Sequence, residues 1–186
     1  MIRNLLKRTV FLTLLLALCL FSTTSFAASA VELNAEADAA LQVFYEEVGS
    51  ASELASMSKG MLILPAVYKG GFLLGAEFGE GVLRINNRTV DYYNSSGLSL
   101  GLLAGVQKKS VILLFMTEDG LAQFRASQNW EIGLDGSVAV VKLGVGKEFD
   151  STNLKSPIIG FVFGNKGLMA NISLEGSKLT RIEKTE

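Results

Sequence analysis

From Lys59 onward the sequence consists of short apolar runs separated by glycines, and this alternation constrains the fold more than any other feature. The runs recur about every 8–12 residues, a spacing typical of antiparallel strands. Asn86-Asn87 lies between two such runs and fits a hairpin turn. We therefore expect a mostly antiparallel, curved or barrel-like β-sheet. In this interpretation the glycines serve turns, bulges and close backbone approaches.

Helices are predicted before the sheet and once within it. Asn34 is expected to cap the first helix and Gly49 to end it, a second short helix follows through Met57, and Thr117 caps a third over residues 118–127. The first helix carries five apolar residues at helical spacing: Leu33, Ala37, Leu41, Phe44 and Val48. We expect this stripe to pack on the core, with contact to a membrane surface as the alternative. The predicted class is α+β, with N-terminal helices preceding the sheet.

Residues 1–27 have the pattern of a secretory signal peptide, with a basic start, an apolar segment over 10–21 and small residues at its end. The apolar segment is shorter than the ~20 residues that span a bilayer. Cleavage is expected after Ala27, or after Ala30. Residues 28–186 then form one domain, exported to the periplasm or cell envelope.

Composition excludes several kinds of site. The chain has no histidine and one cysteine, so it lacks a Ser-His-Asp triad, a His-ligated metal and a thiolate cluster. Removal of residues 1–27 takes three basic residues away and changes the formal charge from −1 to −4. No basic block is present, which argues against nucleic acid as a partner. No catalytic residue, metal or cofactor is predicted.

Two patterns still deserve a chemical interpretation. Glu77 and Glu80 could form a hydrolase pair, although acidic residues beside glycine turns commonly have structural roles. Four lysines lie near predicted strand starts or turns beside small residues: Lys59, Lys69, Lys108 and Lys109. Such lysines are usually solvated, and their alternative role is contact with a lipid phosphate.

The order of the glycine motifs resembles the SYLF lipid-binding domain family, in its bacterial exported branch. The motifs are Ser58-Lys59-Gly60 before an apolar run and Pro65, then Lys69-Gly70-Gly71-Phe72, then Gly79-Glu80-Gly81, and later Gly164-Asn165-Lys166-Gly167. The resemblance covers about residues 35–182. It implies a lipid-binding domain, with phosphoinositide binding in eukaryotic members and actin association in fungal ones.

The sequence therefore predicts an exported, non-enzymatic protein that contacts phospholipid head groups. Lys59 and Lys69 would supply positive charge, the backbone of Gly70 and Gly71 would approach a phosphate, and Phe72 would meet acyl chains. The alternative is a structural or protein-interaction module of the envelope without a lipid ligand.

Overall fold

The computed structural model describes residues 28–71, 74–100, 105–142, 156–167, 174 and 176–184, and it confirms the α+β class. The predicted signal peptide lies outside the described residues. Within them the chain forms three helices and one eight-stranded sheet. The elements are α2 (Ala30–Glu47), α3 (Ala51–Met57), β1 (Gly60–Gly71), β2 (Leu74–Ile85), β3 (Arg88–Leu100), β4 (Gly105–Phe115), α4 (Glu118–Ala126), β5 (Asn129–Glu131), β6 (Val138–Lys142), β7 (Ile158–Gly167) and β8 (Lys178–Ile182).

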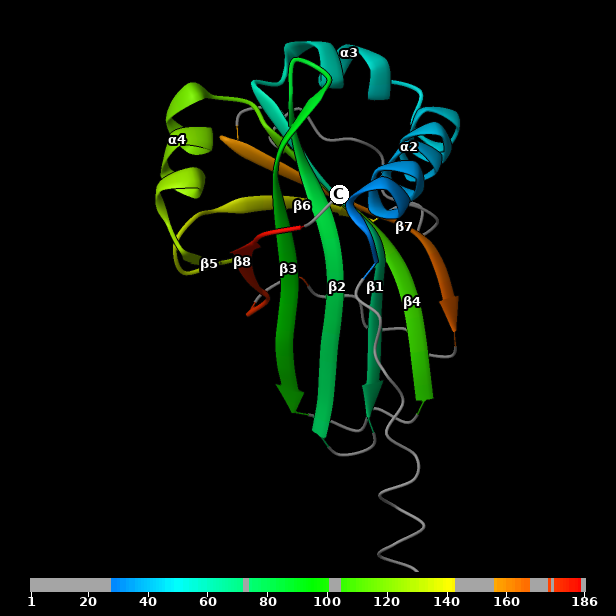
Figure 1. Ribbon diagram of the computed structural model, residues 1–186. Coiled ribbons are helices and arrows are strands. Elements are labelled where there is room, and N and C mark those ends of the chain that lie inside the picture. Colours follow the sequence, from blue (N-terminus) through cyan, green and yellow to red (C-terminus); the bar gives the residue numbers. More distant parts are fainter. Residues whose placement is uncertain are drawn as a thin grey trace, which may run out of the picture.

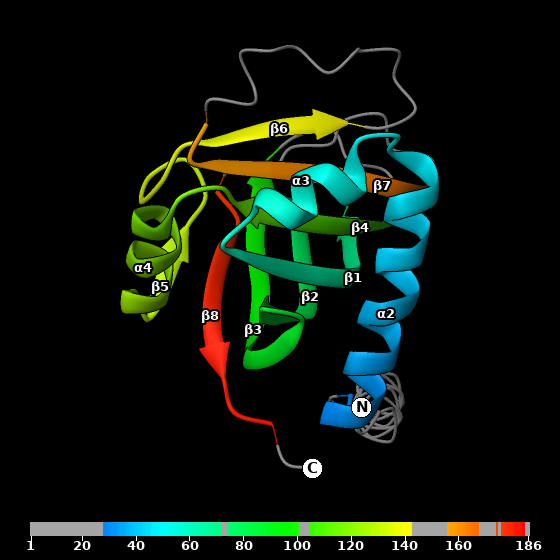
Figure 2. The same cartoon turned by 90° about the horizontal axis from the view of Figure 1, so that it is seen from above.

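The sheet has the strand order β5-β8-β3-β2-β1-β4-β7-β6. All neighbouring strands are antiparallel except β6 and β7, which are parallel. Figure 2, which looks down on the molecule, shows that the sheet is curled, so that it has an inner and an outer face. The curved sheet expected from the sequence is therefore present.

Helix α2 packs its apolar stripe on the outer face, as predicted. Leu33, Ala37 and Phe44 are buried there. The expected cap at Asn34 is wrong, because the Ser29 hydroxyl accepts from the backbone N–H of Glu32 (3.2 Å) and starts the helix five residues earlier. The predicted hairpin turn at Asn86-Asn87 is confirmed, since both residues have positive φ angles and connect β2 to β3.

Two hydrophobic clusters hold the domain together. One fills the inside of the curl beneath α4, where Phe124 packs against the rings of Tyr93, Phe115 and Trp130. Burial there raises the pKa of Tyr93. The other lies between the outer face and the helices α2 and α3.

The central strands are longer than the short apolar runs of the sequence, and Pro65 explains the difference. Pro65 has no N–H to donate to the sheet, and β1 forms a bulge there instead of ending. The Ser110 hydroxyl donates to the Pro65 carbonyl (2.8 Å). Opposite the bulge, Gly79 and Gly81 lie inside β2 rather than in a turn. A Cβ at Gly79 would stand 2.7 Å from the Ala66 carbonyl oxygen, so this motif provides room for the bulge.

Candidate functional site

Beyond the bulge, β1–β4 form an end of the sheet that extends past the helices, as the lower part of Figure 1 shows. We call this part the far end; it comprises residues 67–71, 74–79, 95–100 and 105–109 of the four strands. In three of these strands buried and exposed residues alternate, so one face is covered and the other is open.

Two neighbouring rows of residues cross the far end in register. The row on the inner face pairs Lys69 with both Glu77 and Gln107. The adjacent row on the outer face pairs Gly70 with both Ala76 and Val106, and Ala76 in turn pairs with Leu98. Residues that are distant in sequence are therefore brought together on each face.

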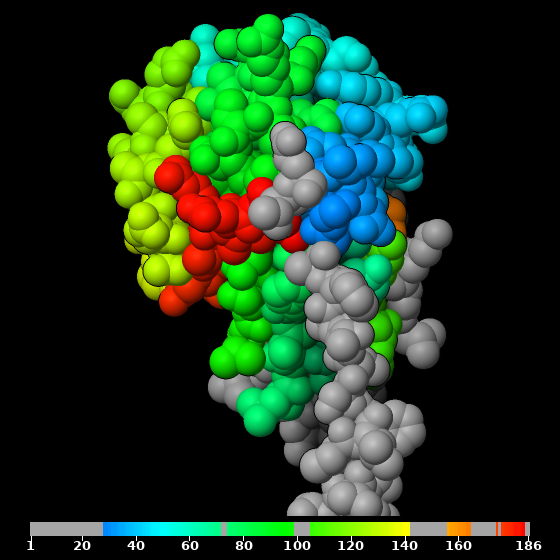
Figure 3. All heavy atoms as spheres, viewed as in Figure 1, coloured from blue at the N-terminus to red at the C-terminus, as the bar shows by residue number. Residues whose placement is uncertain are grey.

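The outer face of the far end carries large apolar side chains in contact with solvent. We call them the outer patch, and they are, with their exposed fractions, Tyr68 (50%), Leu74 (70%), Phe78 (52%), Leu98 (89%) and Val106 (70%). Part of this face is visible below α2 in the space-filling view (Figure 3). Clustered exposed apolar side chains on a folded domain commonly mark a binding surface for a partner or a membrane.

Positive charge accompanies the outer patch. Lys108 lies on the same face, with its Nζ 5.5 Å from the ring centre of Tyr68. At the far end as a whole, Lys69, Lys108 and Lys109 stand against one acidic residue, Glu77. The local charge is positive, whereas the chain as a whole has a formal charge of −1.

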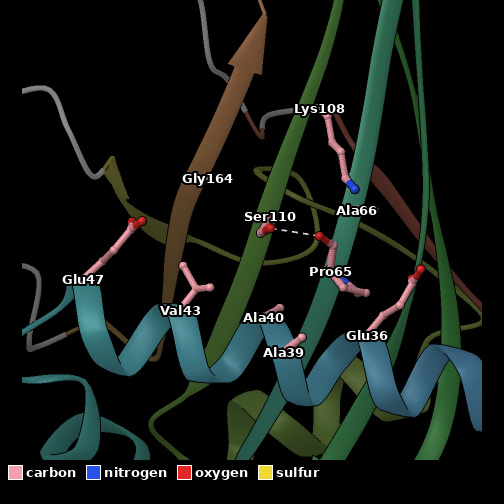
Figure 4. Close-up of a pocket in the computed structure, with 10 residues that line it drawn as sticks. All are labelled: Glu36, Ala39, Ala40, Val43, Glu47, Pro65, Ala66, Lys108, Ser110 and Gly164. Carbon is pink, nitrogen blue, oxygen red and sulfur yellow. Dashed lines mark hydrogen bonds between the residues drawn. The ribbon is translucent and has the colours of Figure 1, made fainter.

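A groove of about 400 Å³ separates the outer patch from α2 (Figure 4). Ala39, Ala40 and Val43 line it on the helix, and Pro65 and Ala66 line it at the bulge. Its charged lining residues are Glu36 and Glu47 on α2 and Lys108 on β4. The outer face is therefore acidic along the helix and basic toward the far end.

The inner face of the far end holds polar side chains that are almost completely buried. We call them the inner polar cluster: Lys69, Glu77, Ser95, Gln107, Lys109 and Ser177. The Lys109 ammonium forms an ion pair with Glu77 Oε2 (2.8 Å), and the Ser177 hydroxyl donates to Glu77 Oε1 (3.1 Å). One carboxylate thus connects β2, β4 and the segment that precedes β8.

The structure brings only some of the sequence-predicted site residues together. Lys69, Gly70 and Gly71 lie at the far end, and Phe72 lies outside the described residues. Lys59 precedes the opposite end of β1, about 30 Å away at the usual rise of a strand. There it lines a smaller pocket with Arg84.

The glycines and lysines also differ from the sequence expectation in their surroundings. Gly70 and Gly71 belong to a central strand with a neighbour on each side, so their backbone is part of the sheet rather than of a phosphate-binding turn. Lys69 and Lys109 are buried instead of solvated. No role was predicted from the sequence for Leu98, Val106 or Gln107. Exposed and buried residues alternate along these strands, and this alternation could have indicated which side chains share a face. It can be used only when the strand boundaries are known.

Glu77 and Glu80 do not form a carboxylate pair. Glu77 belongs to the inner face and bonds to Lys109, whereas Glu80, one residue past Gly79, forms an ion pair with Lys184 (2.7 Å). Among the described residues, no group of three or more His, Cys, Asp or Glu side chains is arranged to hold a metal ion.

Comparison with known proteins identifies the domain. Residues 96–185, which include the end of β3, strands β4 to β8 and helix α4, match a family model named Ysc84 and described as "Las17-binding protein actin regulator". The chain belongs to the Ysc84/SYLF family. The family resemblance seen in the glycine motifs is thereby confirmed.

Relatives in this family include the proteins named SH3 domain-containing YSC84-like protein 1. The chain is 30% identical to the Bos taurus protein over 134 residues and 28% identical to the Homo sapiens protein over 133 residues. Each match covers 69% of this chain and 39% of the relative. The chain therefore matches about two fifths of the length of these Ysc84/SYLF relatives.

None of the helices that the structure describes has the length and apolar character needed to cross a bilayer.

Proposed function

We propose that this Ysc84/SYLF domain is an exported, non-enzymatic protein that binds the surface of phospholipid membranes through the far end of its sheet. The observation that carries this proposal is the outer patch. Five large apolar side chains gather where four strands extend past the helices, and at least half of each side chain's surface is exposed. Burial of such side chains in the acyl region of a bilayer stabilises the bound state by about 1.5–3 kcal/mol each.

The positive charge of the far end supports a lipid membrane as the binding partner of the outer patch. The far end is the basic part of an acidic chain, and Lys108 stands beside Tyr68 at the edge of the patch. A lysine near an anionic membrane surface contributes roughly 1 kcal/mol to binding. Lysine can also keep its ammonium at the level of the phosphates while its carbon chain contacts apolar groups.

Helix α2 is the less suitable membrane contact. Its apolar stripe is buried against the sheet, and Glu36 and Glu47 lie along the groove. These carboxylates would be repelled by anionic lipids. The proposed orientation therefore places the far end toward the bilayer and the helices away from it.

Replacement of Leu98 and Val106 by aspartate tests the role of the outer patch. We expect the double variant of residues 28–186 to lose at least tenfold in binding to phosphatidylglycerol vesicles, because apolar contact is lost and negative charge is added. The measurement is co-sedimentation over a series of lipid concentrations. Both side chains are exposed, so the variant should fold, and circular dichroism checks this.

Leu134→Asp is the matched control, because Leu134 is 77% exposed but lies in a turn outside the far end. It should bind vesicles like the unaltered protein. Equal binding by all three proteins would contradict the assignment of the outer patch. Absence of vesicle binding by the unaltered protein would instead favour the alternative, an envelope module that docks another protein, as the words "Las17-binding" state for the family.

A further inference from the structure

The two candidate cleavage sites of the signal peptide lie three residues apart, and the structure describes the residues between them. Small residues precede both bonds, Ser25 and Ala27 at the first and Ala28 and Ala30 at the second. The sequence therefore permits cleavage after Ala27 or after Ala30. The two products differ only in residues 28–30, and the contacts of these three residues favour one product.

Ala28 is bound by a residue from the other end of the chain. The Lys184 ammonium donates to the Ala28 carbonyl oxygen (2.7 Å) and forms an ion pair with Glu80 Oε2 (2.7 Å). The exposed fractions of the Lys184 and Glu80 side chains are only 6% and 14%. Figures 1 and 2 both show that the tail after β8 approaches the start of α2. Without Ala28, a buried ammonium would lose one of these two acceptors, which is unfavourable.

Ser29 and Ala30 form the start of helix α2. The Ser29 hydroxyl accepts from the Glu32 N–H (3.2 Å), and the Ser29 carbonyl accepts from the Leu33 N–H (2.9 Å). Ala30 is the first residue of the helix and is buried. Cleavage after Ala30 would remove this cap and place a new ammonium on Val31, where the positive end of the helix dipole would repel it.

We propose that the Ala27–Ala28 bond is the cleavage site and that the mature protein begins with Ala28, which Lys184 binds. A signal peptidase of the export machinery would hydrolyse this bond with one water molecule. The C–N bond breaks, the Ala27 carbonyl carbon gains the water oxygen and becomes a carboxylate, and the Ala28 nitrogen gains the two protons and becomes an ammonium. This product retains every residue that caps α2 or contacts Lys184.

This inference rests on the export that the proposed function includes, and it does not depend on the lipid contact. The full chain is produced in a Gram-negative bacterial host, and the protein of the periplasmic fraction is analysed by intact mass spectrometry. We expect the mass of residues 28–186. The mass of residues 31–186, or of any other product, would overturn the inference, and so would a chain that is not cleaved.

A second measurement tests the contacts of residues 28–30. Residues 28–186 and residues 31–186 are purified without added residues, and their thermal unfolding midpoints are compared. The shorter chain should unfold at least about 4 °C lower, because it lacks the helix cap and the Ala28 carbonyl. Equal midpoints would overturn the inference. No cooperative transition in the shorter chain would be the stronger form of the expected result.

Lys184→Met in each of the two chains separates the Ala28 contact from the ion pair with Glu80. The change should lower the midpoint more in residues 28–186 than in residues 31–186, because the shorter chain already lacks one acceptor. Lys178→Met is the matched control, since Lys178 lies exposed on β8, and it should change neither midpoint much. Equal effects of Lys184→Met in both chains would contradict the role of Lys184. Both chains keep the outer patch, so their vesicle binding tests the proposed function separately.

Discussion

Glu77→Gln is expected to destabilise the domain by about 3–5 kcal/mol, the usual effect of removing one partner from a buried ion pair. Glu77 is the only acidic residue of the inner polar cluster and bonds to both Lys109 and Ser177. Its loss removes the carboxylate with which the buried Lys109 ammonium forms its ion pair. Urea unfolding of residues 28–186 measures the change as a lower denaturation midpoint.

A double variant separates this charge effect from a packing effect. Glu77→Gln combined with Lys109→Met removes one charge of each sign, and it should recover a large part of the lost stability. Asp38→Asn is the surface control, because Asp38 pairs with Arg84 (2.6 Å) while 66% of its side chain is exposed. Its cost should stay below about 1 kcal/mol. A Glu77→Gln cost as small as that of Asp38→Asn would contradict the role assigned to the buried pair.

Gly81→Ala is expected to cost about 3 kcal/mol, at the upper end of the usual range for an overpacked core. A Cβ at Gly81 would overlap the carbonyl oxygen of Ile63 and stand 2.7 Å from a methyl carbon of Leu64. The obstacle is partly backbone next to the Pro65 bulge, so a change of side-chain rotamer cannot relieve it. Thermal and urea unfolding should both show the loss.

Gly49→Ala provides the comparison, since nothing lies within 4 Å of a Cβ built there. It should be neutral or slightly stabilising, because alanine reduces the entropy of the unfolded chain. If the two alanine variants unfold at the same urea concentration, the glycines of β2 are not required for the close approach of β1.

The class of the fold could be predicted from the sequence because it depends on local patterns. The helical spacing of Leu33, Ala37 and Phe44 and the turn at Asn86-Asn87 are both contained in short segments. The boundaries of the strands could not be predicted from local patterns in the same way. Pro65 and the glycines at 79 and 81 are usual signs of a break, and only the pairing of β1 with β2 shows that the bulge and the glycines fit each other.

The candidate site was predicted only in part, for a similar reason. The motif around Lys69 and Gly70 marked the far end of β1 from sequence alone. Lys59 was grouped with it because both lysines precede glycine, although Lys59 directly precedes the twelve-residue strand β1 and Lys69 lies near its other end. The partners of Lys69 across the sheet come from β2 and β4. Such register contacts join residues up to 38 positions apart, and no spacing rule within one segment can predict them.

We propose that the far end of the sheet, and not the opposite end, contacts the lipid, and site-specific fluorescence can test this directly. Residues 28–186 contain no cysteine, since the single cysteine is Cys19, so an environment-sensitive fluorophore can be placed at one chosen position. The two positions are Leu98 at the far end and Met57 on α3, which is 56% exposed. Each is changed to cysteine, labelled and titrated with phosphatidylglycerol vesicles. We expect a blue shift of the emission for the label at Leu98→Cys and none at Met57→Cys. A shift at Met57→Cys alone, or vesicle binding with no shift at Leu98→Cys, would contradict it.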